Sequence, residues 1–214
     1  MTRRGRFEAV VVLALAVAAL GVEDAMAVEE AEYAVVESHG SIELRRYAPM
    51  VVAETEVAAT FEDAGGVAFR RLFRYISGDN RARREIAMTA PVVQEDASQK
   101  IAMTAPVVQE GEGSSWRIGF VLPAAFRLAS APEPTDPAVR LRAIPERTVA
   151  AIRFSGTWGE DRFAQHEAEL RAWLAERGLE PVGKAVYARY NAPFVPWFLR
   201  RNEVLVPLGT TPAD

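Results

Sequence analysis

Apolar and polar residues alternate in short runs along most of the chain, which is the two-residue period of half-buried β-strands. Several of these runs are rich in valine, and glycine, proline or serine residues separate them, as is common between strands. The pattern predicts strands over residues 33–37, 42–47, 50–57, 116–122, 147–154, 184–190 and 202–208. These strands are expected to share one sheet.

Two longer segments follow helical spacing instead. Between residues 61 and 77, apolar residues recur every three or four positions, which predicts a helix with one buried stripe. Gly78 comes directly after it, where helices commonly end. The same reasoning predicts a second helix over residues 160–177, closed by Gly178.

The two helices divide the chain into halves with the same layout. In each half a proline (Pro49 or Pro145), a valine-containing strand and an aromatic residue precede the helix, and further strands follow it. The layout predicts an α+β fold made of two pseudo-symmetric β-β-α-β-β halves. These halves would form a curved antiparallel sheet or distorted barrel with two helices on its faces and a cleft between the halves.

The segment from Ile86 to Glu95 recurs letter for letter from Ile101 to Glu110, after a short polar stretch. This predicts that the two copies pair as strands of one sheet. Pro91 and Pro106 lack an amide hydrogen, so each copy is expected at a sheet edge or with a bulge. The odd offset leaves two registers open: an even register with the repeated methionines on opposite faces, or a bulged one that aligns them.

The N-terminal segment has the layout of a secretory signal peptide. Three arginines occur within the first six residues, an apolar run follows from Ala9 to Val22, and Ala25-Met26-Ala27 is a small-x-small cleavage site. The apolar run is shorter than the 20 or so residues that span a membrane. We therefore predict a signal peptide over residues 1–27 and a single domain over residues 28–214, periplasmic or secreted and without a stable membrane anchor.

Composition and missing motifs exclude several kinds of partner and active site. The formal net charge of −4 argues against a nucleic-acid partner, whose binders carry a basic face. The absence of cysteine excludes thiolate metal sites, cysteine nucleophiles and covalent C-x-x-C-H haem attachment. The sequence also lacks the G-x-S-x-G, H-E-x-x-H, Walker A and G-x-G-x-x-G motifs. We therefore expect a binding protein with no catalytic residues.

Four segments, in this order, resemble the SOUL haem-binding protein family. They are an early strand I-E-L-R-R-Y (42–47), an I-A-M-T-A-P-V signature (86–92), a proline-aromatic loop (191–197) and a closing R-R-N-E-V (200–204). The likeness covers about Tyr33 to Leu208. It implies a distorted antiparallel barrel or curved sheet with two helices, and non-covalent binding of haem or a related tetrapyrrole.

The resemblance also implies where the ligand lies. Some animal members carry a histidine directly after the tyrosine that matches Tyr47, proposed as an iron ligand, but this chain has Ala48 there. The resemblance to other members implies a second arrangement. In it the macrocycle lies in an apolar cleft near the first helix and the late aromatic loop, with basic side chains beside it. Carried onto this chain, the cofactor-binding residues are Phe69, Arg70, Phe73, Arg74, Phe194 and Trp197.

Each of these residues has a plainer alternative. Phe69 and Phe73 fit the spacing of a buried helix stripe, the arginines fit a solvated face, and the loop aromatics could plug the end of the sheet. His39, in a turn, and His166, at the edge of the second helix stripe, are the remaining iron ligands to consider. Three functions stay open: an exported tetrapyrrole binder, a binding module for another apolar small molecule, and an enzyme that hydrolyses such a ligand.

Overall fold

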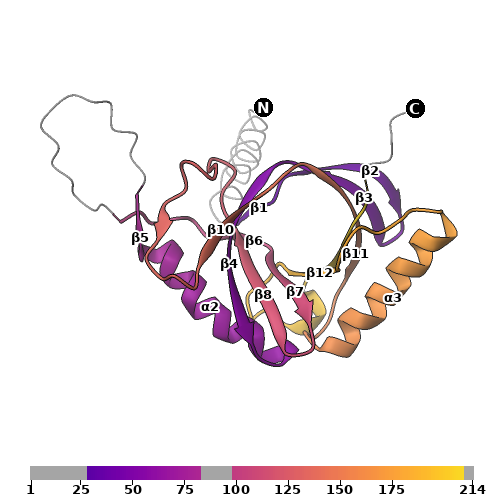
Figure 1. Cartoon of the computed structure of the whole chain (residues 1–214). Coiled ribbons are helices and arrows are strands. Elements are labelled where there is room, and N and C mark those ends of the chain that lie inside the picture. Colours follow the sequence, from indigo (N-terminus) through magenta and orange to yellow (C-terminus); the bar gives the residue numbers. More distant parts are fainter. Residues whose placement is uncertain (1–27, 83–97, 210–214) are drawn as a thin grey trace, which may run out of the picture.

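The computed structural model describes residues 28–82 and 98–209, in which one antiparallel sheet curls into a barrel with two helices packed on its outside (Figure 1). The helices are α2 (Phe61–Ser77) and α3 (Glu160–Glu176). The strands of the sheet are β2 (Tyr33–His39), β3 (Ile42–Tyr47), β4 (Met50–Ala58), β7 (Val107–Glu112), β8 (Ser115–Val121), β10 (Arg140–Ile144), β11 (Arg147–Phe154), β12 (Val186–Arg189) and β13 (Asn202–Pro207).

Smaller elements complete the described chain. β1 (Glu29–Glu30) pairs in parallel with β6 (Thr104–Ala105), and β5 (Asn80–Arg81) pairs antiparallel with β9 (Glu133–Pro134). A short 3₁₀ turn, η2 (Trp197–Leu199), lies between β12 and β13. No helix within residues 28–82 and 98–209 is long and apolar enough to cross a membrane.

The predicted two-fold layout is confirmed, with an exchange of strands that the sequence did not reveal. The sheet order is β10-β4-β8-β7-β12-β13-β11-β3-β2. Half one supplies β3, β4, α2, β7 and β8, and half two supplies β10, β11, α3, β12 and β13. The order shows that the first strand of each half pairs with the second strand of the other half. The two halves are therefore interlocked.

Two long, kinked strands close the barrel. One of them consists of β3 followed by β4, and the other consists of β10 followed by β11. The two run antiparallel in one continuous register, from the Ile42–Ile152 pair to the Glu54–Arg140 pair. Pro49 lies between β3 and β4, and Pro145 lies between β10 and β11, so each proline interrupts one of the two strands. Proline suits these bends because it cannot donate to a ladder.

The outer face of the sheet carries the main core. α2 begins at Thr60, whose hydroxyl accepts a hydrogen bond from the amide of Asp63, and ends at Gly78, which has a φ of 127°. Its buried stripe includes Phe61, Ala64, Ala68, Leu72 and Ile76. α3 contributes Phe163, Leu170 and Leu174 to the same core. The helix predictions are confirmed because both stripes pack as their spacing requires.

The first repeat copy, residues 86–95, falls outside the described residues, so its pairing with the second copy stays a prediction. In the second copy, β7 pairs with β8 along one edge and with β12 along the other. Pro106 sits neither at a sheet edge nor at a bulge but between β6 and β7, where its missing amide hydrogen interrupts neither ladder.

Candidate functional site

An aromatic pair lies on the exposed side of α2. The rings of Phe69 and Phe73 stack with 5.7 Å between centroids and 12° between planes. Phe69 also meets the buried ring of Phe120 edge-on at 5.4 Å. The side chains remain 37% and 46% exposed, so reading both residues as plain core is wrong. One helical turn separates them, which places them on the same face.

The arginines of this helix differ in their partners. Arg74 reaches Asp136 at 3.4 Å and Asp79 at 3.7 Å. Arg71 donates to the hydroxyl of Thr55 at 2.7 Å, and it also lies 3.5 Å from Asp136. Arg70 is exposed and makes no ion pair with any residue the structure describes. Of the two predicted arginines, Arg70 is therefore the one with a guanidinium available for an added carboxylate.

The proline-aromatic loop presents its rings to solvent. Phe194 is 88% exposed and Trp197 is 57% exposed, with Trp197 packed edge-on against Phe198 at 5.6 Å. Arg200 holds the loop by donating to the carbonyls of Pro193 at 2.6 Å and Val195 at 2.7 Å. The interpretation that these aromatics plug the sheet end is wrong, because Phe194 is almost fully exposed and more than half of Trp197 is exposed.

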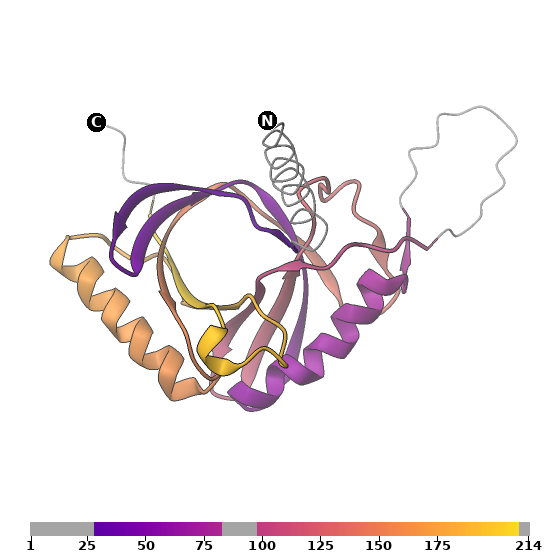
Figure 2. The ribbon, with the colours of Figure 1, turned by 180° about the vertical axis from the view of Figure 1, so that it is seen from behind.

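The loop lies beside the N-terminal half of α2 (Figure 2). Arg189 links them: its guanidinium lies 5.2 Å from the ring of Phe61 and 5.5 Å from the ring of Trp158. Arg200 covers Trp158 at 4.4 Å. Gly65 leaves room for the Arg189 side chain, since a Cβ at residue 65 would come within 2.8 Å of the Arg189 guanidinium. Burial lowers the pKa of Arg189 to about 10.

The predicted aromatic residues form two separate groups, one on α2 and one on the loop that lies beside the N-terminal half of that helix (Figure 2). Phe69 and Phe73 contact each other, and Trp197 contacts Phe198. We call this surface the α2–loop face; it consists of Phe69, Arg70, Phe73, Phe194, Trp197 and Phe198.

Both histidines lie with α3 and not on the α2–loop face. The ring of His39 is 6.3 Å from that of Trp173 on α3. His166 stacks on Phe154 at 4.0 Å, and its Nδ1 is 3.2 Å from a carboxylate oxygen of Glu169. Neither imidazole is on the elements that carry the predicted aromatic residues.

A closed polar network fills one end of the barrel interior. Its centre is Glu203, which is fully buried and accepts hydrogen bonds from Arg45 at 2.6 and 3.0 Å, from Arg201 at 3.0 Å and from the hydroxyl of Tyr190 at 2.8 Å. Arg45 also donates to Glu43 at 2.7 Å. We call these five residues the Glu203 network.

The Glu203 network explains two of the sequence segments noted above. Glu43 and Arg45 come from I-E-L-R-R-Y, while Arg201 and Glu203 come from R-R-N-E-V. Burial alone would raise the pKa of the Glu203 carboxyl, but the hydrogen bonds and charges of Arg45 and Arg201 hold the pKa below its ordinary value. These segments therefore stabilise the barrel, a role that no local pattern revealed.

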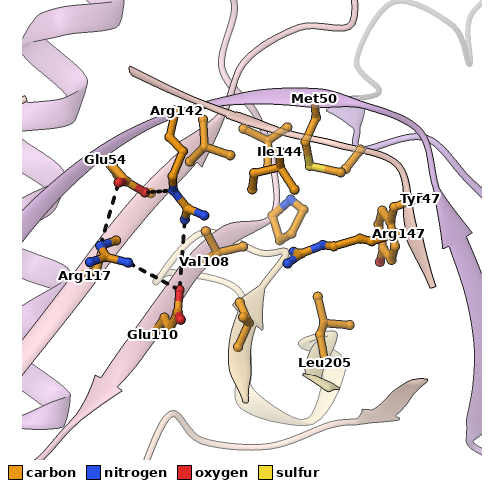
Figure 3. Close-up of a pocket in the computed structure, with 16 residues that line it drawn as sticks. Tyr47, Met50, Glu54, Val108, Glu110, Arg117, Arg142, Ile144, Arg147 and Leu205 are labelled. Carbon is orange, nitrogen blue, oxygen red and sulfur yellow. Dashed lines mark hydrogen bonds and ion pairs between the residues drawn. The ribbon is translucent and has the colours of Figure 1, made fainter. Parts of the chain in front are cut away.

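A chamber occupies the rest of the barrel interior, between the two halves (Figure 3). Its cavity volume is about 40 Å³. Its apolar wall combines Val52, Val108 and Val121 of half one with Ile144, Val186 and Leu205 of half two. None of the six predicted site residues lines this chamber.

Charged side chains gather at one side of the chamber. Glu54 pairs with Arg142 at 2.8 Å and with Arg117 at 3.7 Å, and Glu110 lies 3.8 Å from Arg117 and 4.0 Å from Arg142. Figure 3 shows Arg147 reaching from beside Tyr47 toward the centre of the chamber. Sequence reasoning missed this site, because its charged residues come from five strands spread along the chain.

These features define a class: a two-repeat α+β barrel with helices outside and a chamber between the repeats. A crystal structure of the C-terminal domain of EcmrR has the same fold, with a TM-score of 0.57 and 9% identity over 79% of this chain and 98% of that one. The family model for the SOUL heme-binding protein matches residues 28–207, and the chain belongs to this family.

The chain is also similar to curated relatives over most of its length. It is 27% identical to Heme-binding protein 1 of Xenopus tropicalis over 165 residues, which cover 77% of this chain and 82% of the relative. Heme-binding protein 1 of Xenopus laevis is 26% identical over the same length.

Proposed function

We propose that this chain is an exported protein that binds haem or a related tetrapyrrole non-covalently at the α2–loop face, and that it acts by binding and not by catalysis. The observation that carries the proposal is the stacked, exposed pair of Phe69 and Phe73 beside the unpaired Arg70. Membership of the SOUL family and the similarity to Heme-binding protein 1 support the ligand class.

The residues of this face fit a flat macrocycle that carries carboxylates. Aromatic rings stack on the faces of such a ligand, and a guanidinium pairs with a propionate. Gly66, one turn before Arg70, has no heavy atom within 4 Å of where a Cβ would be, so a flat ring meets open space there. The two loop aromatics, Phe194 and Trp197, offer a second apolar surface.

Burial of the ring, and not ligation of iron by a histidine, is the expected source of affinity. His39 and His166 both lie with α3, away from the α2–loop face. Covering about 300 Å² of apolar surface contributes roughly 7 kcal/mol before the cost of association. Iron-free protoporphyrin is therefore expected to bind nearly as well as haemin.

Haemin titrations followed by the Soret band test the site. We expect Phe73→Ala and Trp197→Ala to weaken binding by about tenfold, in line with the loss of aromatic contact and buried area. Arg70→Gln should weaken it by a few-fold. Arg74→Gln is the matched control, because its guanidinium already has aspartate partners, and it should bind as the wild type does.

Three results would overturn this account. Loss of binding in His39→Ala or His166→Ala alone would identify that histidine as an iron ligand. Wild-type affinity in all three α2–loop variants would place the ligand elsewhere. No binding of either porphyrin would favour another apolar ligand, or the hydrolytic alternative.

Export is tested separately. The charged start, the bounded apolar run and the small-x-small site together support cleavage after Ala27. Mass spectrometry of protein recovered from the periplasm should show a chain that begins at Val28. Recovery of the full-length chain from the inner membrane would contradict export with cleavage.

A further inference from the structure

We propose that residues 193–199, which we call the loop tip, insert into the surface of a phospholipid bilayer and dock the chain there reversibly. Four large apolar side chains of the loop tip are exposed: Phe194, Trp197, Phe198 and Leu199. Three of them also belong to the α2–loop face, but docking requires no porphyrin, and Leu199 belongs to the loop tip alone. This role is therefore separate from the proposed haem binding.

The exposed apolar area of the loop tip is concentrated in residues 194–199. Phe194 is 88% exposed, and the side chains of η2, Trp197, Phe198 and Leu199, are 57%, 58% and 64% exposed. Apolar residues gathered in this way mark interaction sites, whereas scattered ones are ordinary. Together they expose roughly 500 Å², less than the roughly 800 Å² that one partner contributes to a standard protein interface. A bilayer requires no matching rigid surface, and tryptophan favours the interface between lipid and water.

The backbone of the loop tip is suited to apolar surroundings. Pro193 and Pro196 have no amide hydrogen to desolvate. The carbonyls of Pro193 and Val195 accept hydrogen bonds from the guanidinium of Arg200 at 2.6 and 2.7 Å, and the carbonyl of Pro196 accepts one from the amide of Leu199 at 2.9 Å. Backbone groups that enter lipid unpaired are costly, so these internal bonds lower the cost of insertion.

Arg200 lies at the base of the loop tip, at the level expected for lipid headgroups. Its guanidinium covers the ring of Trp158 at 4.4 Å and makes no ion pair with any residue that the structure describes. It is therefore available to a lipid phosphate, a group that arginine binds well. Glu62 and Asp63, in the first turn of α2 beside the loop, offset this charge (Figure 2). Apolar contact, and not headgroup charge, is therefore expected to dominate docking.

Flotation with phosphatidylcholine vesicles, without porphyrin, tests the proposal on residues 28–214. This chain contains every described residue and omits the apolar run of residues 9–22, which would bind lipid by itself. Wild type should bind the vesicles, and Phe194→Ser and Leu199→Ser should each bind about tenfold more weakly, as expected for losing one buried apolar side chain. Val36→Ser is the matched control, because Val36 is an exposed apolar residue on β2, and it should bind as the wild type does.

Trp197 reports insertion directly. It is exposed, whereas Trp116 is buried and Trp158 and Trp173 are partly buried. Vesicles should therefore shift the fluorescence emission of the wild type to shorter wavelength, and brominated phosphatidylcholine should quench it. Trp197→Phe keeps an aromatic ring, so it should still float with the vesicles but lose most of the emission shift.

Two variants separate docking from haem binding. Leu199→Ser should leave haemin affinity unchanged, and Phe73→Ala should leave vesicle binding unchanged, so each proposal can fail without the other. Circular dichroism establishes that each variant is folded. Three results would each overturn docking: no flotation of the wild type, equal flotation of the wild type and both serine variants, or flotation only when phosphatidylglycerol is added. A wild-type dimer that Phe194→Ser dissociates in analytical ultracentrifugation would also overturn it, by assigning the loop tip to a second copy of the chain.

Discussion

The two charged regions inside the barrel occupy equivalent places in the two halves, yet they are built differently. Arg45 on β3 pairs across the sheet with Val149 of β11, and Arg142 on β10 pairs with Val52 of β4. In the Glu203 network, the carboxylate opposite Arg45 is fully buried and accepts hydrogen bonds from two arginines. At Arg142, the ion pairs are partly exposed and border the chamber.

The difference shows how one duplicated position can serve two purposes. Where the network is closed, every charge has a partner and the interior is filled. Where it is open, Arg117 stands at the place on β8 that Glu203 holds on β13, and it pairs with Glu54, Glu56 and Glu110 in partly exposed ion pairs. We infer that the closed end holds the barrel together, while the open end contributes less to its stability.

The largest expected effect comes from breaking the closed end. Glu203→Gln removes the buried carboxylate that the buried Arg45 and the partly exposed Arg201 share, leaving them only Glu43 and Glu30, and removing one partner of a buried ion pair typically costs about 3–5 kcal/mol. Urea unfolding should show this loss. The matched control is Glu54→Gln at the open end, where partial exposure should keep the loss near 1 kcal/mol. Equal losses in the two variants would contradict the distinction.

Acid should act on the same carboxylate. The pKa of Glu203 in the folded chain is below the ordinary 4.5, so its contribution to stability is present above that pH and disappears as the pH falls through the folded pKa. The free energy of unfolding of the wild type should therefore decline below pH 4.5. In Glu203→Gln the decline should be shallower, and parallel acid profiles would show that other carboxylates govern it.

Removing the charge of Arg147 should not lower the free energy of unfolding. Arg147→Met exchanges a desolvated guanidinium for an apolar side chain of similar length, so it should leave stability unchanged or raise it by about 1 kcal/mol. Thermal unfolding without added ligand measures this. A clear loss of stability would show that Arg147 supports the barrel.

The smallest effect is expected at Glu110. Its distances to Arg117 and Arg142, 3.8 and 4.0 Å, are long for ion pairs, and its side chain is 31% exposed. Glu110→Gln should cost less than about 0.5 kcal/mol, and 1 M salt should abolish the difference from wild type. A larger, salt-resistant cost would mean that the open end is as tightly built as the closed one.

Local patterns predicted much of the fold because they report burial within one element. The spacing of Phe61, Leu72 and Ile76 predicted α2 to the residue, with Gly78 after it. The matching layouts of the halves predicted the two-fold plan. The exchange of β3 and β10 was not predictable in this way, since it depends on which strands pair across the halves. β10 itself was missed, because five residues with arginines at two positions give little strand signal.

The candidate sites show the same limit. Helical spacing could not decide whether Phe69 and Phe73 face the core or solvent, because both lie at the edge of the buried stripe. The repeat suggested a hairpin, but β7 has β8 and β12 as its neighbours. Arg147 carries no motif at all. Its significance depends on which side chains surround it in the folded barrel.

The interlocked halves have a consequence for how the chain folds. Arg45 and Glu203, which meet in the buried network, are 158 residues apart along the sequence. Half one, once synthesised, lacks β10 beside β4 and β11 beside β3, so its sheet has open edges until half two appears. Such a dependence on distant contacts slows folding, because the entropy of closing long loops is lost before the contacts can form. The newly made chain is therefore expected to acquire stable structure late and in a single step, after its last strand is available.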